Sequence, residues 1–225
     1  MAQLDSRLAA DARWNQRRDL LLWLALVAAG MAAAAGATAA GMDLGSDAPP
    51  FEGRYRVDLA PSAIAAPLVA AAVLWASSRR FTARWRWKTL FVASYLAAFA
   101  WMLSLAVTAG ADGLTRFTSR ADERLPGVAE STSISEVFVA YADPAGTVPG
   151  HPPGPSLLLW ALRRLSGDDL WIAVAWTALA ALTVPLVLAT ARSACGPAAA
   201  RRLAPVLVLA PFAVWAAVGP EGVTA

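Results

Sequence analysis

The chain has 225 residues, of which 58% are hydrophobic and 16% are charged, and its formal net charge is +3. Soluble domains carry about 25% charged and about 45–50% apolar residues, so this composition excludes an ordinary soluble globule and a disordered chain. The single cysteine excludes a disulfide scaffold. The sequence therefore predicts an integral membrane protein.

Five runs without charged residues predict the membrane spans. They cover residues 20–40, 61–77, 90–109, 170–190 and 203–218. An α-helix rises about 1.5 Å per residue, so roughly 20 residues cross a hydrocarbon core of about 30 Å. The second and fifth runs are shorter than this. Because backbone polar groups in lipid need partners within the protein, we expect an all-α fold, a polytopic transmembrane helix bundle of about five spans in one membrane domain.

The first run has features of both a membrane anchor and a secretory signal. Arg17 and Arg18 precede it, and the small residues at 37–39 resemble a cleavage site. A signal core has about 7–15 apolar residues, whereas this run has 21 and follows a leader of 19 residues. We therefore expect an uncleaved anchor, with a cleaved signal as the alternative.

The charges between the runs predict the orientation in the membrane. Residues 78–89 hold four Arg and Lys88 without an acid, and residues 191–202 hold three Arg. Residues 110–169 hold eight acids and five Arg. Lys and Arg of membrane proteins gather on the cytoplasmic side. We therefore expect a multi-pass protein of the cell membrane, with a cytoplasmic N-terminus and with the loop 110–169 outside.

Tryptophan and arginine alternate in the basic loop, over residues 84–87. Such a pattern could stack nucleic-acid bases between cations. Next to two predicted spans, it is more typical of anchoring at the membrane interface and of contact with anionic lipid headgroups. We therefore expect the lipid bilayer as a partner and no nucleic acid.

The outer loop 110–169 is much longer than a connection between two spans requires. Residues 133–136, with the sequence Ser-Ile-Ser-Glu, form a capping box, and Ile134, Val137, Phe138 and Tyr141 follow a helical spacing. This pattern predicts an interfacial helix over residues 133–142 on the outer membrane surface. A second interfacial helix is predicted over residues 156–165, after a run of prolines.

Two short motifs of the outer loop carry the residue types that acid–base chemistry uses. Asp122 and Glu123 are adjacent acids, and His151, the only histidine of the chain, precedes Pro152 and Pro153. By residue type alone, each motif is also typical of a solvated loop. One histidine and two adjacent acids do not make a metal site by themselves. We expect no cofactor, and a divalent metal remains an open alternative.

The order of these motifs resembles the GT-C class of membrane glycosyltransferases, in particular the protein mannosyltransferases and the aminoarabinose transferases of lipid A. The resemblance covers roughly residues 88–218: an acid pair after a span, a surface helix, His-Pro-Pro, a leucine-rich helix and an apolar span. It implies transfer of a sugar from a polyprenyl-phosphate donor to an acceptor at the outer face. Because such enzymes have further spans, we expect the chain to be a member that is truncated at its C-terminus.

The resemblance also implies roles for individual residues. Asp122 would be the catalytic base for the acceptor hydroxyl, Glu123 would assist it, and His151 would contact the donor phosphate or position the acid loop. Pro152 and Pro153 would shape the substrate site. Arginine matches the geometry of phosphate, so the arginines beside the acids are candidates for substrate binding, although a stripe facing solvent or headgroups explains them equally well. These arginines are Arg116, Arg120 and Arg124.

Two other functions compete with the enzyme. The chain could be a non-catalytic membrane scaffold or subunit that uses the outer loop as a docking surface. A transporter is disfavoured because no predicted span carries a charged residue. An enzyme should bring the carboxylate of Asp122 or Glu123 within about 10 Å of the His151 ring, whereas a scaffold has no need to do so.

Overall fold

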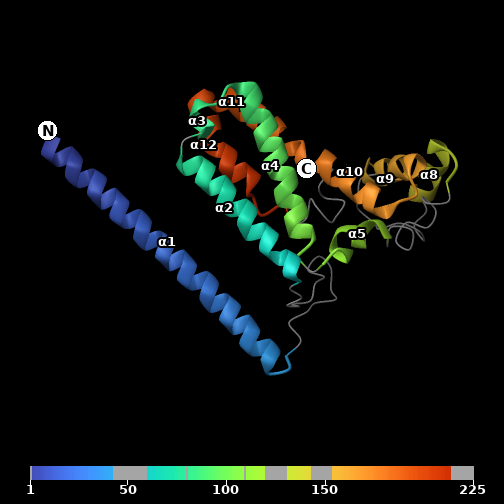
Figure 1. Ribbon diagram of the computed structural model, residues 1–225, viewed down its shortest axis with the longest axis horizontal. Coiled ribbons are helices and arrows are strands. Elements are labelled where there is room, and N and C mark those ends of the chain that lie inside the picture. Colours follow the sequence, from blue (N-terminus) through green and yellow to red (C-terminus); the bar gives the residue numbers. More distant parts are fainter. Residues whose placement is uncertain are drawn as a thin grey trace. The chain divides into compact units, whose positions relative to one another are not determined.

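The computed structural model describes residues 2–42, 60–79, 81–108, 110–119, 131–142 and 154–213 (Figure 1). Every regular element within these residues is a helix, which confirms the predicted all-α fold. The chain divides into two units, residues 1–57 and residues 58–225. Among these described residues, four helical segments are long and apolar enough to cross a membrane, so the chain has the character of an integral membrane protein.

The first unit contains the single long helix α1 (Ala2–Ala39). Its apolar part, Leu21–Ala39, is one of the four candidate spans and is the first predicted run almost residue for residue. Two residues after the helix end stands Gly41, whose φ of 77° favours glycine. The amide of Gly41 donates to the carbonyl of Thr38, and the amide of Met42 donates to that of Ala37. These two bonds form a Schellman cap, which satisfies the last carbonyls of the helix.

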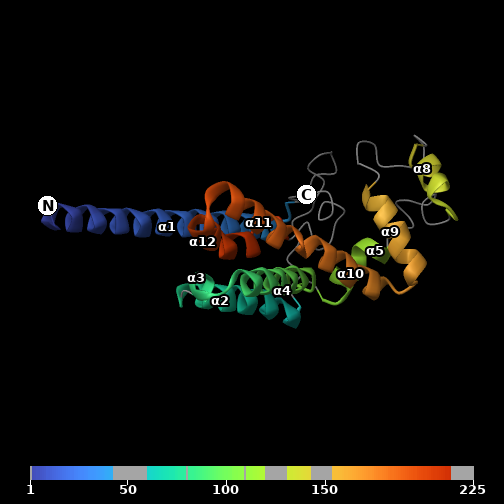
Figure 2. The same cartoon turned by 90° about the horizontal axis from the view of Figure 1, so that it is seen from above.

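The second unit begins with an antiparallel pair of helices. The short helix η1 (Pro61–Ile64) leads into α2 (Ala65–Ser78), and α3 (Phe81–Arg84) connects it to α4 (Trp87–Ala106). Hydrogen bonds join the start of η1 to the chain directly after the end of α4. The Ala60 amide donates to the Thr108 carbonyl at 2.9 Å, and the Ser62 hydroxyl donates to the Val107 carbonyl at 2.5 Å. Figure 2 shows α2 and α4 side by side.

The fourth predicted run is a helix with a break in the middle. Helices α10 (Asp169–Ala181) and α11 (Thr183–Cys195) together make a candidate span of 27 residues, interrupted at Leu182. Pro185 has no amide hydrogen to donate to the carbonyl of Ala181, four residues earlier, and its ring crowds the preceding turn. The break therefore follows from one residue, and it lies in the middle of the apolar segment.

The fifth predicted run takes a different form from the expected span. Helix α12 (Pro197–Val208) begins after Gly196, whose φ is 82°, and it packs back against α11. It has 12 residues and is not among the four candidate spans. Pro211 follows closely and cannot continue a helix, which accounts for the early end. Within the described residues, this segment is therefore a short helix that starts before the predicted run.

The core of the second unit lies between α4, α10, α11 and α12. Ala98 and Met102 of α4 pack with Ala180, Val184 and Val208 of the other three helices, and all five are buried. Small side chains at these contacts let helix backbones approach closely, which matters in lipid because apolar burial alone does not drive helix association there.

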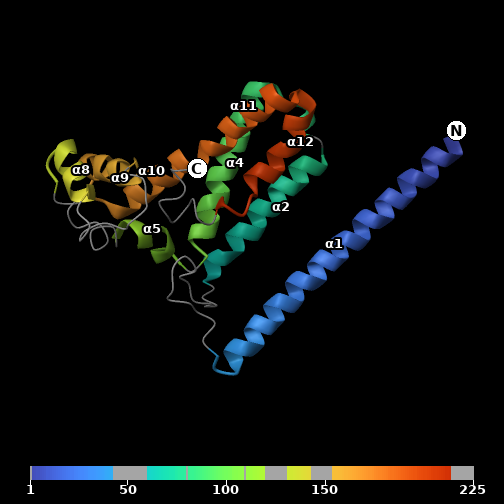
Figure 3. The same cartoon turned by 180° about the vertical axis from the view of Figure 1, so that it is seen from behind.

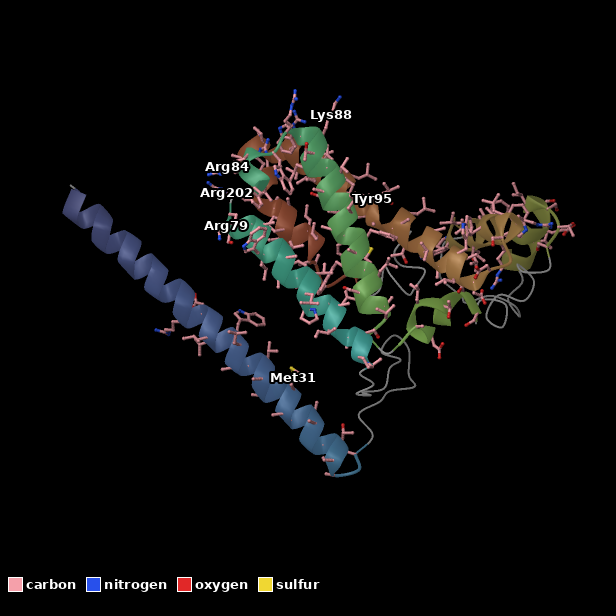
Figure 4. The ribbon with its side chains drawn as sticks, in the orientation of Figure 1. Met31, Arg79, Arg84, Lys88, Tyr95 and Arg202 are labelled. Carbon is pink, nitrogen blue, oxygen red and sulfur yellow. The ribbon has the colours of Figure 1, made fainter. Side chains whose placement is uncertain are left out.

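The positive charges gather at one end of the second unit. Arg201 of α12 donates from Nη1 to the carbonyls of Thr82 and Trp85, at 2.6 and 2.8 Å. This contact joins the two basic loops, 78–89 and 191–202, which the charge pattern predicts to lie on the same side of the membrane. Figure 4 shows Arg79, Arg84, Lys88 and Arg202 at this end, which we call the basic end.

Candidate functional site

Most of the predicted site residues lie outside the described residues. Arg116 belongs to a described helix, but its side chain is not described. The others are Asp122, Glu123, Arg120, Arg124, His151, Pro152 and Pro153. The structure therefore leaves their proposed convergence a prediction. It does describe the helices that hold both ends of the segment 120–130 and the two helices that flank the segment 143–153.

Three short helices flank these two segments in the sequence. Helix α5 (Asp112–Ser119) precedes the acid segment, and α8 (Ile134–Ala142) follows it; α9 (Gly154–Leu165) begins directly after His-Pro-Pro. Helices α8 and α9 were predicted, whereas α5 was not. The three lie near the N-terminal end of α10, far from α3 and from the turn between α11 and α12 (Figures 2 and 3).

Two glycines allow α5 to fold back onto the end of α4. Gly110 has a φ of 102°, a conformation that side chains with a Cβ rarely adopt. At Gly113, a Cβ atom would overlap the backbone carbonyl of Ala106. The close approach of α5 to the end of α4 therefore requires glycine at position 113. This contact positions α5, the helix that ends directly before the acid segment.

Arg163 of α9 connects α5 to the start of α10. Its Nη2 donates to the carbonyl of Thr118 at 2.5 Å and to Oδ1 of Asp169 at 3.2 Å. The hydroxyl of Thr118 donates to the carbonyl of Asp169 at 3.2 Å, and Thr118 is buried. A guanidinium suits this position because its rigid fork of donors can serve two acceptors at once. The last turn of α5 is thereby attached to α9 and α10.

Ser131 is attached to the same helix on the other side of the acid segment. Its carbonyl accepts from Trp160 Nε1 and from Arg164 Nη2, each at 2.9 Å. The Arg164 guanidinium also lies over the Trp160 ring, 5.6 Å from its centroid. Trp160 thus helps to attach Ser131 to α9.

These contacts bond the residues on both sides of the acid segment to α9. Thr118 and Ser131 flank residues 120–130, and both are bonded to consecutive arginines of α9, Arg163 and Arg164. The first residue of α9, Gly154, follows His151 by three positions. In the described part of the chain, the residues on both sides of segment 120–130 are thus bonded to α9, the helix that begins three positions after His151.

An apolar contact holds α9 against α10. Leu159 and Leu162 of α9 pack against Ile172 and Trp176 of α10, and all four side chains are buried. Asp168 caps α10, since its side chain accepts from the Leu170 amide at 2.8 Å. Helix α9 is therefore docked on a candidate membrane span.

The predicted capping box starts α8, with one additional partner. The Ser133 hydroxyl accepts from the Glu136 amide at 3.3 Å, as expected. The Glu136 carboxylate accepts from the Thr132 amide at 2.6 Å and from its hydroxyl at 3.0 Å. These bonds, chiefly the one from the Thr132 amide, lower the pKa of Glu136 because they stabilise its charged form.

Helix α8 presents both buried and exposed apolar side chains. Val137 is fully buried, whereas Ile134, Phe138 and Val139 are exposed. The exposed apolar side chains agree with a helix that lies on a membrane surface, since such a helix keeps an apolar face toward the acyl chains. The predicted apolar stripe is thus divided, because Val137 faces the protein.

No protein-family model, curated protein or solved structure matches the chain. Among the described residues, no three His, Cys, Asp or Glu side chains gather as potential metal ligands. The fold and the loop contacts are thus the basis for assigning a function.

Sequence reasoning missed the two arginines of α9 as the residues that organise the loop. Arg163 and Arg164 stand at the end of a leucine-rich segment, where basic residues commonly interact with the helix dipole. Their acceptors are backbone carbonyls 45 and 33 residues away in the sequence. No local pattern identifies such acceptors.

Proposed function

We propose that this integral membrane protein is a glycosyltransferase of the GT-C type. It transfers a sugar from a polyprenyl-phosphate donor to an acceptor hydroxyl at the outer face of the membrane. The catalytic residues are Asp122, Glu123 and His151, as the resemblance of the motifs implies.

One observation carries this proposal: the residues on both sides of the acid segment are bonded to the helix that follows His-Pro-Pro. Thr118 and Ser131 are attached to Arg163 and Arg164 of α9. A fully extended chain spans at most about 3.6 Å per residue, so Asp122 lies within about 15 Å of Thr118. Helix α9 spans about 18 Å from end to end. These lengths allow the acid pair and His151 to meet beside α9.

The proposed chemistry needs one base and one place for the departing phosphate. The Asp122 carboxylate accepts the proton of the acceptor hydroxyl as the hydroxyl oxygen attacks the anomeric carbon. The bond between that carbon and the phosphate oxygen breaks, and polyprenyl phosphate leaves with the electron pair. Attack from the face opposite the phosphate inverts the anomeric centre, as in glycosidases that use a carboxylate base. His151 contacts the phosphate, and the arginines near the acids neutralise its charge.

The experiment uses the purified chain in phospholipid vesicles with polyprenyl-phosphate mannose or polyprenyl-phosphate aminoarabinose, labelled in the sugar. Donor binding and sugar transfer are measured separately. Asp122→Asn keeps the shape of the side chain and removes the base, so it should lower transfer by about 10²-fold or more while donor binding persists. The matched control is Asp112→Asn, an exposed acid in the first turn of α5.

The control variant should transfer the sugar at the rate of the unmodified chain. Equal transfer rates for Asp122→Asn and the unmodified chain would remove Asp122 from the mechanism. A chain that binds neither donor would favour the membrane scaffold, in which the outer loop serves as a docking surface.

A further inference from the structure

The basic end of the second unit holds a concentration of positive charge without acids. Seven basic residues stand in α2–α4 and α11–α12 or directly beside them: Arg79, Arg84, Arg86, Lys88, Arg192, Arg201 and Arg202. Within residues 60–213, the described acids are Asp112, Glu136, Asp168 and Asp169, and all four belong to the segments around α5, α8 and α10. The positive charge of this end is therefore not balanced by the described part of its own unit.

Two of these cations converge on one indole ring. The guanidinium carbons of Arg192 and Arg201 lie 4.3 and 4.5 Å from the centroid of the Trp87 ring. The two carbons are consequently no more than about 9 Å apart, a distance at which like charges repel through a low-dielectric surface. Arginine stays charged at every physiological pH. The pair is thus a fixed double positive charge on a partly buried aromatic platform.

The two arginines differ in what else they do. Arg201 is half-buried, and its Nη1 donates to the carbonyls of Thr82 and Trp85. Arg192 is exposed, and its described contact is the Trp87 ring alone. Arg192 can therefore direct its five donors to a ligand, while Arg201 positions the ring between the helices.

The helices that carry the basic end also expose apolar side chains. Trp75 and Leu74 of α2 and Val92 of α4 are each more than half exposed, and Leu203 of α12 is also exposed. Figure 4 shows the basic residues grouped at the ends of these helices. Cations and exposed apolar side chains on the same helices match the two parts of a phospholipid, a charged headgroup and acyl chains.

We propose that Trp87, Arg192 and Arg201 form a binding site for the phosphate of an anionic phospholipid, which we call the Trp87 clamp. The lipid phosphate accepts hydrogen bonds from the Arg192 guanidinium and offsets the repulsion between the two arginines. The acyl chains lie along the exposed apolar side chains of α2, α4 and α12. This site is independent of the sugar chemistry proposed for the opposite end.

The test measures how strongly the reconstituted chain prefers an anionic lipid. Spin-labelled phosphatidylglycerol and spin-labelled phosphatidylcholine are compared in phosphatidylcholine vesicles, and their relative association constant is determined. The unmodified chain should prefer phosphatidylglycerol. Arg192→Gln should reduce that preference about tenfold or more, because the phosphate loses hydrogen bonds from a charged donor.

Arg202→Gln is the matched control, since Arg202 is also an exposed arginine of the basic end and follows Arg201 in α12. Its removal should change the preference by less than about twofold, because an exposed charge outside the clamp is screened by salt. Equal losses for the two variants would mean diffuse attraction by any cation and would overturn the clamp. Displacement of the spin-labelled lipid by soluble glycerol phosphate would identify a site for free phosphate and would overturn the assignment to lipid.

Arg192→Lys keeps the test decisive if Arg192→Gln does not fold. Lysine retains the charge but lacks the planar fork that contacts both the ring and a phosphate. The preference for phosphatidylglycerol should therefore fall although the net charge is unchanged. An unchanged preference in this variant would contradict the clamp.

Discussion

The contact between Arg163 and α5 leads to the most quantitative prediction. In Arg163→Gln, the carbonyl of buried Thr118 loses a charged donor at 2.5 Å, and Asp169 loses its ion pair at 3.2 Å. A hydrogen bond from a charged donor contributes about 1.5–3 kcal/mol. The Asp169 side chain is 37% exposed, so solvent reduces the ion pair to about 0–1 kcal/mol. The two contributions together span about 1.5–4 kcal/mol. We therefore expect the attachment of α5 to weaken by about 2–3 kcal/mol, near the middle of this range.

Hydrogen exchange of the α5 amides measures this weakening directly. If α5 opens by detaching from α9, exchange in Arg163→Gln should be about 30- to 150-fold faster, the factor that 2–3 kcal/mol represents. Arg164→Gln is the matched control. Its acceptor, the Ser131 carbonyl, keeps the Trp160 donor, so the cost should be no more than about 1 kcal/mol. Unchanged α5 exchange in Arg163→Gln, or equal effects of both variants, would refute the proposed role of Arg163.

Three further predictions follow from the loop and the charges. Gly113→Ala should lower stability by about 1–3 kcal/mol because its Cβ would overlap the Ala106 carbonyl, whereas Gly167→Ala, where the space is open, should change it little in a chemical unfolding assay. The lowered pKa of Glu136 means that its carboxylate stabilises α8 at neutral pH and that this stabilisation is lost as the pH falls through the lowered value. Spin-label mobility on α8 should therefore rise in acid, and Glu136→Gln should abolish that pH dependence; a pH-independent mobility in the unmodified chain would contradict it. A topology reporter placed after residue 84 should be cytoplasmic and one placed after residue 142 external, and the opposite result for either would overturn the orientation.

The helices and the grouping of charges could be predicted from local pattern. The first four of the five uncharged runs correspond to the four candidate spans, and the first three have bounds within three residues of the observed ones. Ser133 and Glu136 marked the start of α8. The Arg and Lys residues of two separate loops predicted that both loops lie on one side of the membrane, and the bonds of Arg201 between these loops agree with that prediction. Such features are readable because each depends on the composition of one segment.

The contacts that organise the outer loop could not be predicted in the same way. Helix α5 has few apolar residues, and it is held by Gly113 and by Arg163 from a helix much later in the chain. The short form of α12 was missed because hydropathy does not register where a proline ends a helix. Asp122, Glu123 and His151, the proposed catalytic residues, lie outside the described residues, so their meeting remains a prediction.

The distance between positions 122 and 151 tests the central claim most directly. Cys195 is exposed and is the only cysteine, so Cys195→Ser provides a background for Asp122→Cys with His151→Cys. Spin labels on the two cysteines should give one narrow distance distribution below about 20 Å, the sum of an approach within about 10 Å and the reach of the labels. A broad distribution, or a distance well beyond that limit, would contradict the convergence of the acid pair with His151 and with it the proposed active site.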